Sequence, residues 1–184
     1  MWWSTVNLTK CLITMSEIID NSLQKVKFRQ DILSVQNGLQ EMIKNGVIES
    51  TLEDCKVKHY FSPVDENYGC CTYAREMFIP KDTLIIGKIH KHQHLNIISK
   101  GKVIVYTEFG EKHLEAPITF VSEIGLKRSV YAVEDTLWTT IHLTKFSNEN
   151  DLDKIEDEVI STNYENMGLI DSVDALLENK GNIL

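Results

Sequence analysis

The chain has 184 residues, of which 42% are hydrophobic and 25% are charged. This composition is typical of one globular domain with extensions and excludes two large domains. The formal charge of −8 at pH 7 argues against a nucleic-acid partner, because proteins that bind nucleic acid gain most of their affinity by neutralising phosphates.

The first fifty residues divide into a short extension and a helical segment. Residues 1–15 lack a basic leader and a long apolar run, so they resemble neither a secretion signal nor a membrane span. We expect a flexible extension there, in a cytoplasmic protein with no membrane partner. From Ser16, which is placed to cap a first turn, apolar residues recur at helical intervals through residues 16–50. We expect two helices, because Asn37-Gly38 and Asn45-Gly46 are both typical stop signals.

The four cysteines are expected to be reduced thiols. Their spacings match neither a zinc ribbon nor a redox pair, and the residues are Cys11, Cys55, Cys70 and Cys71. Cys70 and Cys71 are adjacent and would point to opposite faces of a strand, so we expect one to be buried and the other exposed. A disulfide or a metal role is the alternative.

Residues 56–145 change to a period of two, with short runs of β-branched and aromatic residues separated by polar turns. Strands are expected at residues 56–62, 70–79, 83–90, 93–99, 102–107, 118–122, 127–133 and 136–144. Many short strands without intervening helices predict a mainly β fold, a single closed antiparallel barrel or jelly roll that removes exposed edges.

Residues 147–184 form an acidic tail that we expect to be helical. A first apolar set, which includes Leu152 and Ile155, is expected to pack on the barrel. A second set, from Leu169 to Leu177, suits either the barrel or a partner helix. We expect a homodimer, because helices at both ends of the chain have apolar faces that need cover.

The densest group of reactive side chains lies in residues 87–94, where three of the six histidines fall within five positions. In an extended strand, one face of this segment would carry Lys88, His90, His92 and His94. We expect some bending near Lys91, which would break this parity. The pattern predicts a histidine-rich pocket inside the barrel, built around His90 and His94. His59 and His113 look peripheral and are assigned no role.

Residues 56–145 resemble the cupin superfamily in the spacing of two motifs. The first motif is a His-x-His pair followed at fixed spacing by Glu and Gly. Anchored on Gly101, its ligand positions fall on Lys88, His90 and His94. The second motif has one identical residue, Gly125, and its histidine falls on Arg128. The resemblance implies the jelly-roll barrel of RmlC-like cupins. A short acidic cupin with helical flanks also resembles small proteins carried by bacteriophages.

The resemblance implies a divalent metal (Fe, Mn, Ni or Zn). Its ligands would be His90 and His94, with help from His92, Glu134 or His142. Two of the four ligand positions are cationic here, and Lys88 and Arg128 cannot ligate while protonated. A second interpretation is an anion site, since the guanidinium of Arg128 matches phosphate or carboxylate. In a third, both cations lie on a solvated rim.

Residues 131–142 alternate so that one face carries Glu134, Trp138 and His142. Glu134 and His142 would form a carboxylate–imidazole pair, either at a metal or as an acid–base couple, and Tyr131 joins Glu134 as a candidate catalytic residue. His142 is equally compatible with a hydrogen-bonded core position. Trp138 suits the core or stacking on a ring-shaped ligand.

Three functions follow as hypotheses. The first is a binding protein that sequesters or senses a small anionic ligand, such as a nucleotide or a sugar phosphate, through Lys88, Arg128, Trp138 and His142. The second is an enzyme, either a metal-dependent oxygenase or isomerase or a metal-free epimerase, as the cupin resemblance implies. The third is a structural or interaction protein in which the barrel carries the helical ends.

Overall fold

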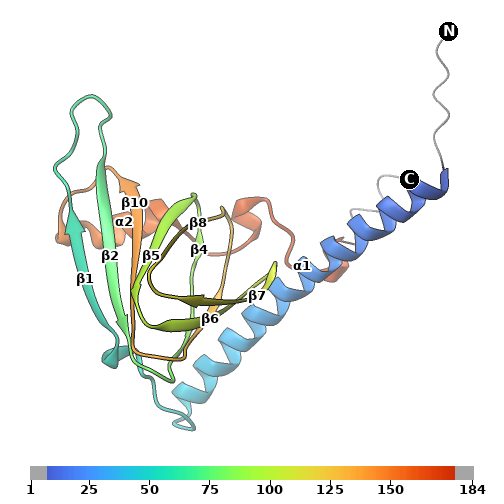
Figure 1. Ribbon diagram of the computed structural model, residues 1–184, viewed down its shortest axis with the longest axis horizontal. Coiled ribbons are helices and arrows are strands. Elements are labelled where there is room, and N and C mark those ends of the chain that lie inside the picture. The colour runs from blue at the N-terminus through green and yellow to red at the C-terminus, as the bar shows by residue number, and fades with distance from the viewer. Residues whose placement is uncertain (1–7, 177–184) are drawn as a thin grey trace.

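The period-two pattern of residues 56–145 forms antiparallel strands, as predicted. The structure is a computed structural model that describes the backbone of residues 8–176 and the side chains of residues 20–176 (Figure 1). The strands are β1 (Lys56–Phe61), β2 (Cys71–Ile79), β3 (Leu84–Ile86), β4 (Ile89–His90), β5 (His94–Lys100), β6 (Lys102–Thr107), β7 (Gly110–Glu115), β8 (Ile118–Ser122), β9 (Ser129–Ala132), β10 (Thr136–Thr144) and β11 (Ile160–Ser161). Each predicted range overlaps one strand, except that residues 83–90 contain both β3 and β4.

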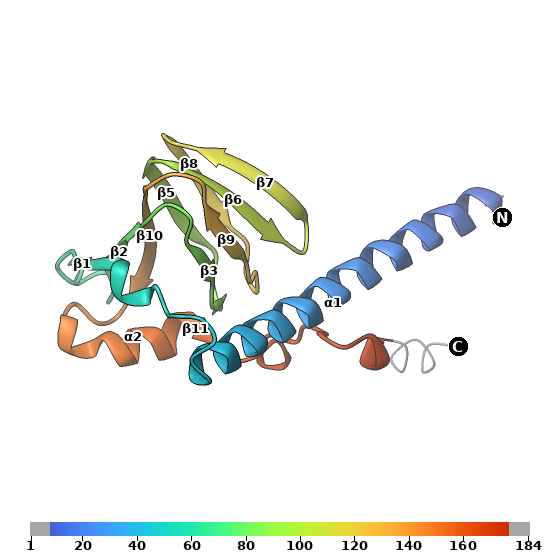
Figure 2. The ribbon, with the colours of Figure 1, turned by 90° about the horizontal axis from the view of Figure 1, so that it is seen from below.

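The strands form two facing sheets, with the orders β1-β2-β10-β5-β8 and β3-β9-β6-β7 (Figures 1 and 2). From β2 to β10 the chain alternates between these sheets, apart from the β6–β7 hairpin and the short β4, which pairs with β11. This strand order is that of a jelly roll, the architecture that cupins use. The predicted mainly β fold is therefore confirmed. Among the described residues, the fold consists of the two facing sheets and a small third sheet of β4 and β11. The facing sheets have separate edges, so the strands form the jelly roll and not the closed ring that the sequence also allowed.

The main core lies between the two sheets, and its buried residues include Ile98, Val103, Ala132 and Trp138. Gly101 joins β5 to β6 with a φ of 91°, and a Cβ at this position would lie 2.4 Å from the carbonyl oxygen of Asp135. Only glycine fits this turn. The residue on which the cupin spacing was anchored therefore has a steric reason to be glycine.

One helix, α1 (Leu8–Lys44), replaces the two that the sequence predicted. Gly38 lies inside this helix, where glycine costs only about 1 kcal/mol relative to alanine. The helix ends instead at Lys44, just before the second signal, where Gly46 has a φ of 68°. There the N–H of Val47 donates to the carbonyl of Met42 at 2.9 Å, the bond that defines a Schellman cap.

The two parts of α1 differ in their contacts. Its N-terminal end extends past the sheets (Figures 1 and 2) and begins within residues 1–15, which were expected to be a flexible extension. Residues 1–7 lie outside the described part. Further along, Arg29 donates to both carboxylate oxygens of Glu108 at 2.6 and 2.7 Å and to the carbonyl of Ile170 at 2.9 Å. These bonds fix α1 to the β6–β7 hairpin and to the C-terminal tail.

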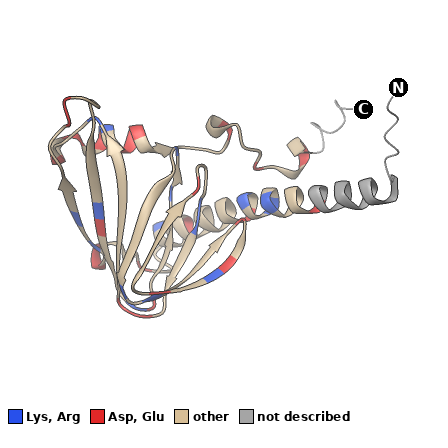
Figure 3. Cartoon of the chain, turned by 45° about the horizontal axis from the view of Figure 1, so that its top comes forward, with Lys and Arg blue, Asp and Glu red and all other residues tan. Residues whose placement is uncertain are grey.

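The C-terminal tail is helical only in part. The acidic helix α2 (Leu152–Val159) lies across one end of the jelly roll (Figures 2 and 3), and its Ile155 and Val159 are buried against Tyr73. β11 follows directly. Residues 173–176 are helical, and Leu177, the last of the predicted second apolar set, lies outside the described residues. None of the described helices is long and apolar enough to cross a membrane.

The cysteines follow the strand parity expected of them. Cys71 is buried and its thiol donates to the carbonyl of Phe146 at 3.2 Å, whereas Cys70 is partly exposed. Both are free thiols, as is the buried Cys55. The side chain of Cys11 lies outside the described part.

Candidate functional site

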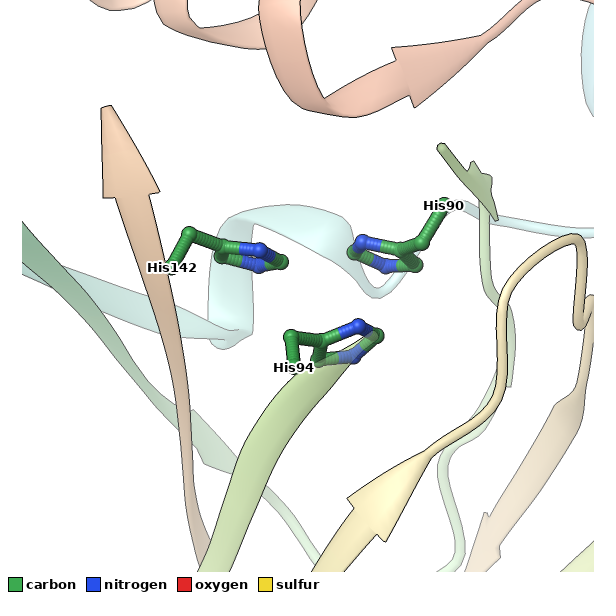
Figure 4. Close-up of side chains that lie close together, drawn as sticks. All are labelled: His90, His94 and His142. Atoms are coloured by element: carbon green, nitrogen blue, oxygen red, sulfur yellow. The ribbon is translucent and has the colours of Figure 1, made fainter. Parts of the chain in front are cut away.

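Three histidine side chains meet at the end of the jelly roll that α2 covers (Figure 4). His90 lies on β4, His94 begins β5 and His142 lies on β10. The ring centroids are 4.0 Å apart for His90 and His94, 4.6 Å for His94 and His142, and 5.1 Å for His90 and His142. One nitrogen from each ring lies within 4.8 Å of the other two. A single small ion can therefore contact all three rings.

A bend separates His90 from His94 and lets their rings approach each other. Residues 91–92 leave the extended conformation, as the sequence predicted near Lys91. The backbone of His90 is held on two sides, since its carbonyl accepts from the N–H of Gly125 at 2.8 Å and β11 pairs with it through Ile160. The ring of His90 therefore extends from a segment that is fixed by its neighbours.

The register of the sheet brings His142 beside His94. β5 and β10 are neighbours, and Leu95 opposes Ile141. His94 and His142 are the adjacent residues on the two strands, so both project from the opposite, inner face. On its other side His142 opposes Tyr73 of β2. Sheet pairing alone thus places two imidazoles together in the interior.

All three imidazoles are neutral at pH 7. Burial, with smaller contributions from His94 and His142, lowers the pKa of His90 to about 2. Burial also lowers the pKa values of His94 and His142 to about 4. Nδ1 of His94 lies 3.2 Å from the carbonyl oxygen of His92, which can only accept, so Nδ1 carries the proton and Nε2 keeps a free lone pair.

The donor set fits a divalent transition metal. Neutral imidazole suits Zn, Cu, Fe and Ni, and three histidines with an open position form one ligand set of catalytic zinc sites. A carbonyl that fixes the second nitrogen of a ligand histidine, as that of His92 does for His94, is typical of such sites. Nδ1 of His90 is buried and has no hydrogen-bond partner among the described residues. Such an atom is costly, and a metal bond would satisfy it.

A buried guanidinium lies next to the histidines. Arg128 is 7% exposed, and one of its amino groups donates to the hydroxyl of Ser122 and lies 3.5 Å from Nε2 of His94. None of the ion pairs among the described residues includes Arg128. Burial lowers its pKa to about 10, so it stays protonated at neutral pH. A positive charge with further donors therefore faces the cluster.

Two histidines of the cluster, His90 and His142, line a cavity of about 400 Å³ between the sheets and α2. This volume lies in the range of small-molecule sites, which are mostly apolar with a few placed polar groups. The apolar walls include Met77, Ile79, Ile85, Val130 and Trp138. The charged lining residues are Arg75, Lys88, Arg128 and Glu156.

Lys88 and His92 flank the cluster without joining it. The exposed Lys88 lies at the rim of the cavity and forms an ion pair with Glu156 of α2. The side chain of His92 is exposed at the bend, and only its carbonyl contacts the cluster. The bend at residues 91–92 breaks the strand parity that would place four side chains on one face, as expected near Lys91. Lys88 takes the rim position that was one of its alternatives.

The structure places the candidate catalytic residues Tyr131 and Glu134 away from the cavity. The hydroxyl of Tyr131 donates to Asp82 at 2.8 Å on the surface. Glu134 is exposed and lies 3.7 Å from the ammonium group of Lys102. Tyr131 alternates with the buried Val130 on β9 and so faces outward, and Glu134 lies in the turn before β10.

Trp138 belongs to the core between the sheets and also lines the cavity, so both of its predicted places remain open. Its indole N–H donates to the side-chain oxygen of Asn96 at 2.9 Å, and the guanidinium carbon of Arg128 lies 5.5 Å from its ring centroid. Asn96 is fully buried on β5 and was not singled out from the sequence.

Two further polar residues of the cavity were also not identified from the sequence. His59 was assigned no role, yet it lines the cavity, and its Nδ1 lies 2.7 Å from the hydroxyl of Tyr73. Arg75 lies between the buried Tyr73 and Met77 on β2. The sequence could have indicated Arg75, because it lies two residues from each of these apolar residues and therefore shares their face of the strand.

Comparison with solved structures finds similar chains of low sequence identity, and the description of one of them names an RmlC-like cupin. An ectoine synthase from P. lautus is 10% identical, with a TM-score of 0.42 over 59% of this chain and 75% of that chain. KdgF from Halomonas sp. is 15% identical, with a TM-score of 0.37 over 51% of this chain and 93% of that chain. An RmlC-like cupin from Shewanella frigidimarina is 12% identical, with a TM-score of 0.37 over 53% of this chain and 89% of that chain. No family model and no curated protein matches the chain.

Proposed function

We propose that the protein binds a small anionic ligand in the cavity, at a divalent metal ion held by His90, His94 and His142. The observation that carries this proposal is the convergence of three neutral imidazoles, one of which has a buried nitrogen with no other partner among the described residues. When bound, the metal would supply a Lewis acid that faces the cavity.

The position of Arg128 favours an anionic group on the ligand. Two like charges 4 Å apart repel by about 4 kcal/mol at an effective dielectric constant of about 20. A metal ion bound to His94 would therefore be repelled by the guanidinium of Arg128. A carboxylate or phosphate group between them offsets the repulsion and accepts hydrogen bonds from the guanidinium. We therefore expect metal and anion to strengthen each other's binding.

Metal binding to untagged, chelator-treated protein tests the proposal. A titration with Co²⁺, followed by absorption spectroscopy and calorimetry, is expected to give one ion per chain. His94→Ala and His142→Ala should each weaken Co²⁺ binding by at least about 100-fold, because loss of an outer hydrogen-bond partner alone costs about 10–100-fold.

His92→Ala is the matched control, because this imidazole is adjacent in sequence but exposed. The control should bind Co²⁺ as the wild type does. No stoichiometric binding by the wild type, or equal losses in His92→Ala and His142→Ala, would contradict the metal site.

A metal-free anion-binding protein is the second candidate function. It is favoured by the position of Arg128, whose amino group lies 3.5 Å from Nε2 of His94. A guanidinium N–H that donates to this nitrogen occupies the lone pair that a metal ion would need. A sugar phosphate is a ligand of this class. Phosphate binding that Arg128→Gln abolishes, in a protein that takes up no Co²⁺, would select this candidate.

A further inference from the structure

The charged residues that line the cavity carry an excess of positive charge, although the whole chain has a formal charge of −8. The cationic lining residues are Arg75, Lys88 and Arg128, and the one carboxylate in the lining of this cavity, among the described residues, belongs to Glu156. That carboxylate already pairs with Lys88 at the rim. Two guanidinium groups are thus left facing the cavity without a carboxylate partner in its lining.

Arg75 enters the cavity from a different wall than Arg128. It lies on β2, opposite His59 of β1 and Thr140 of β10. Its alternate neighbour Tyr73 is buried on the inner face, so the side chain of Arg75 also points inward. This orientation agrees with its place in the cavity lining.

The two guanidinium groups flank the histidine cluster. Arg75 opposes the residue two positions before His142 on β10, so the two are diagonal neighbours, typically about 7–8 Å apart. Arg128 approaches from the other side, through His94 of β5 and Ser122 of β8. β10 and β5 lie between β2 and β8 in the sheet. Groups bound by the two arginines would therefore lie at opposite ends of one ligand.

We infer that the ligand carries two anionic groups, one bound by Arg128 beside the histidines and the other by Arg75. Such a ligand neutralises both guanidinium charges, which are otherwise costly in a cavity with apolar walls. Its spacer lies against apolar side chains that include Met77, Ile85 and Val130. Short dicarboxylates and phosphonocarboxylates belong to this class. The inference deepens the proposed function by naming the charge of the ligand, and it does not depend on the metal.

Calorimetry with matched pairs of probes tests the inference. Succinate, glutarate and adipate are compared with butyrate, pentanoate and hexanoate, which keep the chain length and lose one carboxylate. 3-Phosphonopropionate distinguishes a phosphorus anion from a carboxylate. Each titration is made on chelator-treated and on zinc-loaded protein. At least one dianion should bind about tenfold or more tightly than its matched monoanion, because it gains a charge-assisted contact.

Substitution of each arginine separates the two anion positions. Arg75→Gln should remove the preference for dianions over monoanions, because it weakens the binding of dianions only. Arg75→Lys keeps the positive charge and should retain most of this preference. Arg128→Gln should weaken dianions and monoanions alike, because both use the position beside the histidines.

Lys58→Gln is the matched control, since Lys58 is an exposed cation on the outer face of β1. It should bind every probe as the wild type does. Equal affinity for dianions and monoanions, a preference that survives Arg75→Gln, or no binding of any dianion to either form of the protein would overturn the inference. A dianion preference in protein that binds no zinc would support the inference while removing the metal from the proposed function.

Discussion

His90, His94 and His142 should make folding stability depend on pH. Their folded-state pKa values of about 2, 4 and 4 lie below the value of about 6.5 expected in the unfolded chain. Between about pH 4 and 6.5 the unfolded chain therefore binds more protons than the folded one, so stability falls as the pH is lowered through this window. Above about pH 7 the rings are neutral in both states and contribute no slope.

Urea denaturation of metal-free protein at pH 7 and at pH 5 measures this dependence. Each histidine is expected to contribute up to about 1.4 kcal/mol of unfolding free energy per pH unit within the window. The loss between the two pH values should shrink in His142→Gln and stay unchanged in His113→Gln, which removes an exposed ring. Equal stability of the wild type at both pH values would contradict the burial of neutral imidazoles.

For single residues, the sequence identified the histidines of the site but missed the polar residues beside them. The density of histidines in residues 87–94 singled out His90 and His94, and strand parity added His142. Asn96 and Arg75 were not found, because a polar residue in a strand faces either solvent or the interior, and the pairing register decides between the two. That register depends on strands far away in the sequence.

Among the elements, apolar strands were predictable and a polar strand was not. β7, with the sequence Gly-Glu-Lys-His-Leu-Glu, lacks the alternating apolar pattern and was not predicted. Its backbone bonds to β6, and its charged side chains suit the edge of a sheet. The predicted strand at residues 83–90 is divided at Gly87, whose N–H donates to the carbonyl of Arg128 at 2.8 Å. Both differences from the prediction, the extra strand β7 and the break at Gly87, therefore depend on hydrogen bonds to residues elsewhere in the chain.

The attachment of α1 to the jelly roll depends on Arg29 and Glu108, whose side chains are only 9% and 8% exposed. Arg29→Met leaves the carboxylate of Glu108 buried without its partner. We expect the free energy of unfolding to fall by about 3–5 kcal/mol, as measured by chemical denaturation.

The double variant Arg29→Met with Glu108→Leu is the control, because it removes both charges and should recover most of the lost stability. A single variant as stable as the wild type would show that this ion pair does not hold α1 in place.

For the whole molecule, the homodimer expected from the sequence remains a prediction. On the outer face of the β10, β5 and β8 strands, Leu95 opposes both Ile141 and Val121, which makes a continuous apolar row. Leu95 is 43% and Val121 54% exposed, so a second copy of the chain packed on this row would remove apolar surface from water. We expect light scattering to give a dimer mass at micromolar concentration.

Val121→Lys should convert this dimer to a monomer, because it places a charge in the apolar row. Tyr106→Lys changes an exposed residue of β6 in the other sheet and should leave the mass unchanged. A wild-type monomer would remove the predicted dimer.

One divalent ion bound by His90, His94 and His142 is the feature on which the proposed function depends. A crystal structure of untagged protein grown with Zn²⁺, with an anomalous difference map recorded at the zinc edge, tests it most directly. We predict one strong peak per chain, bonded to a nitrogen of each of the three rings at about 2.0–2.1 Å. A map without a peak between these rings, or with its peak at the exposed His92 or His113, would contradict the metal centre.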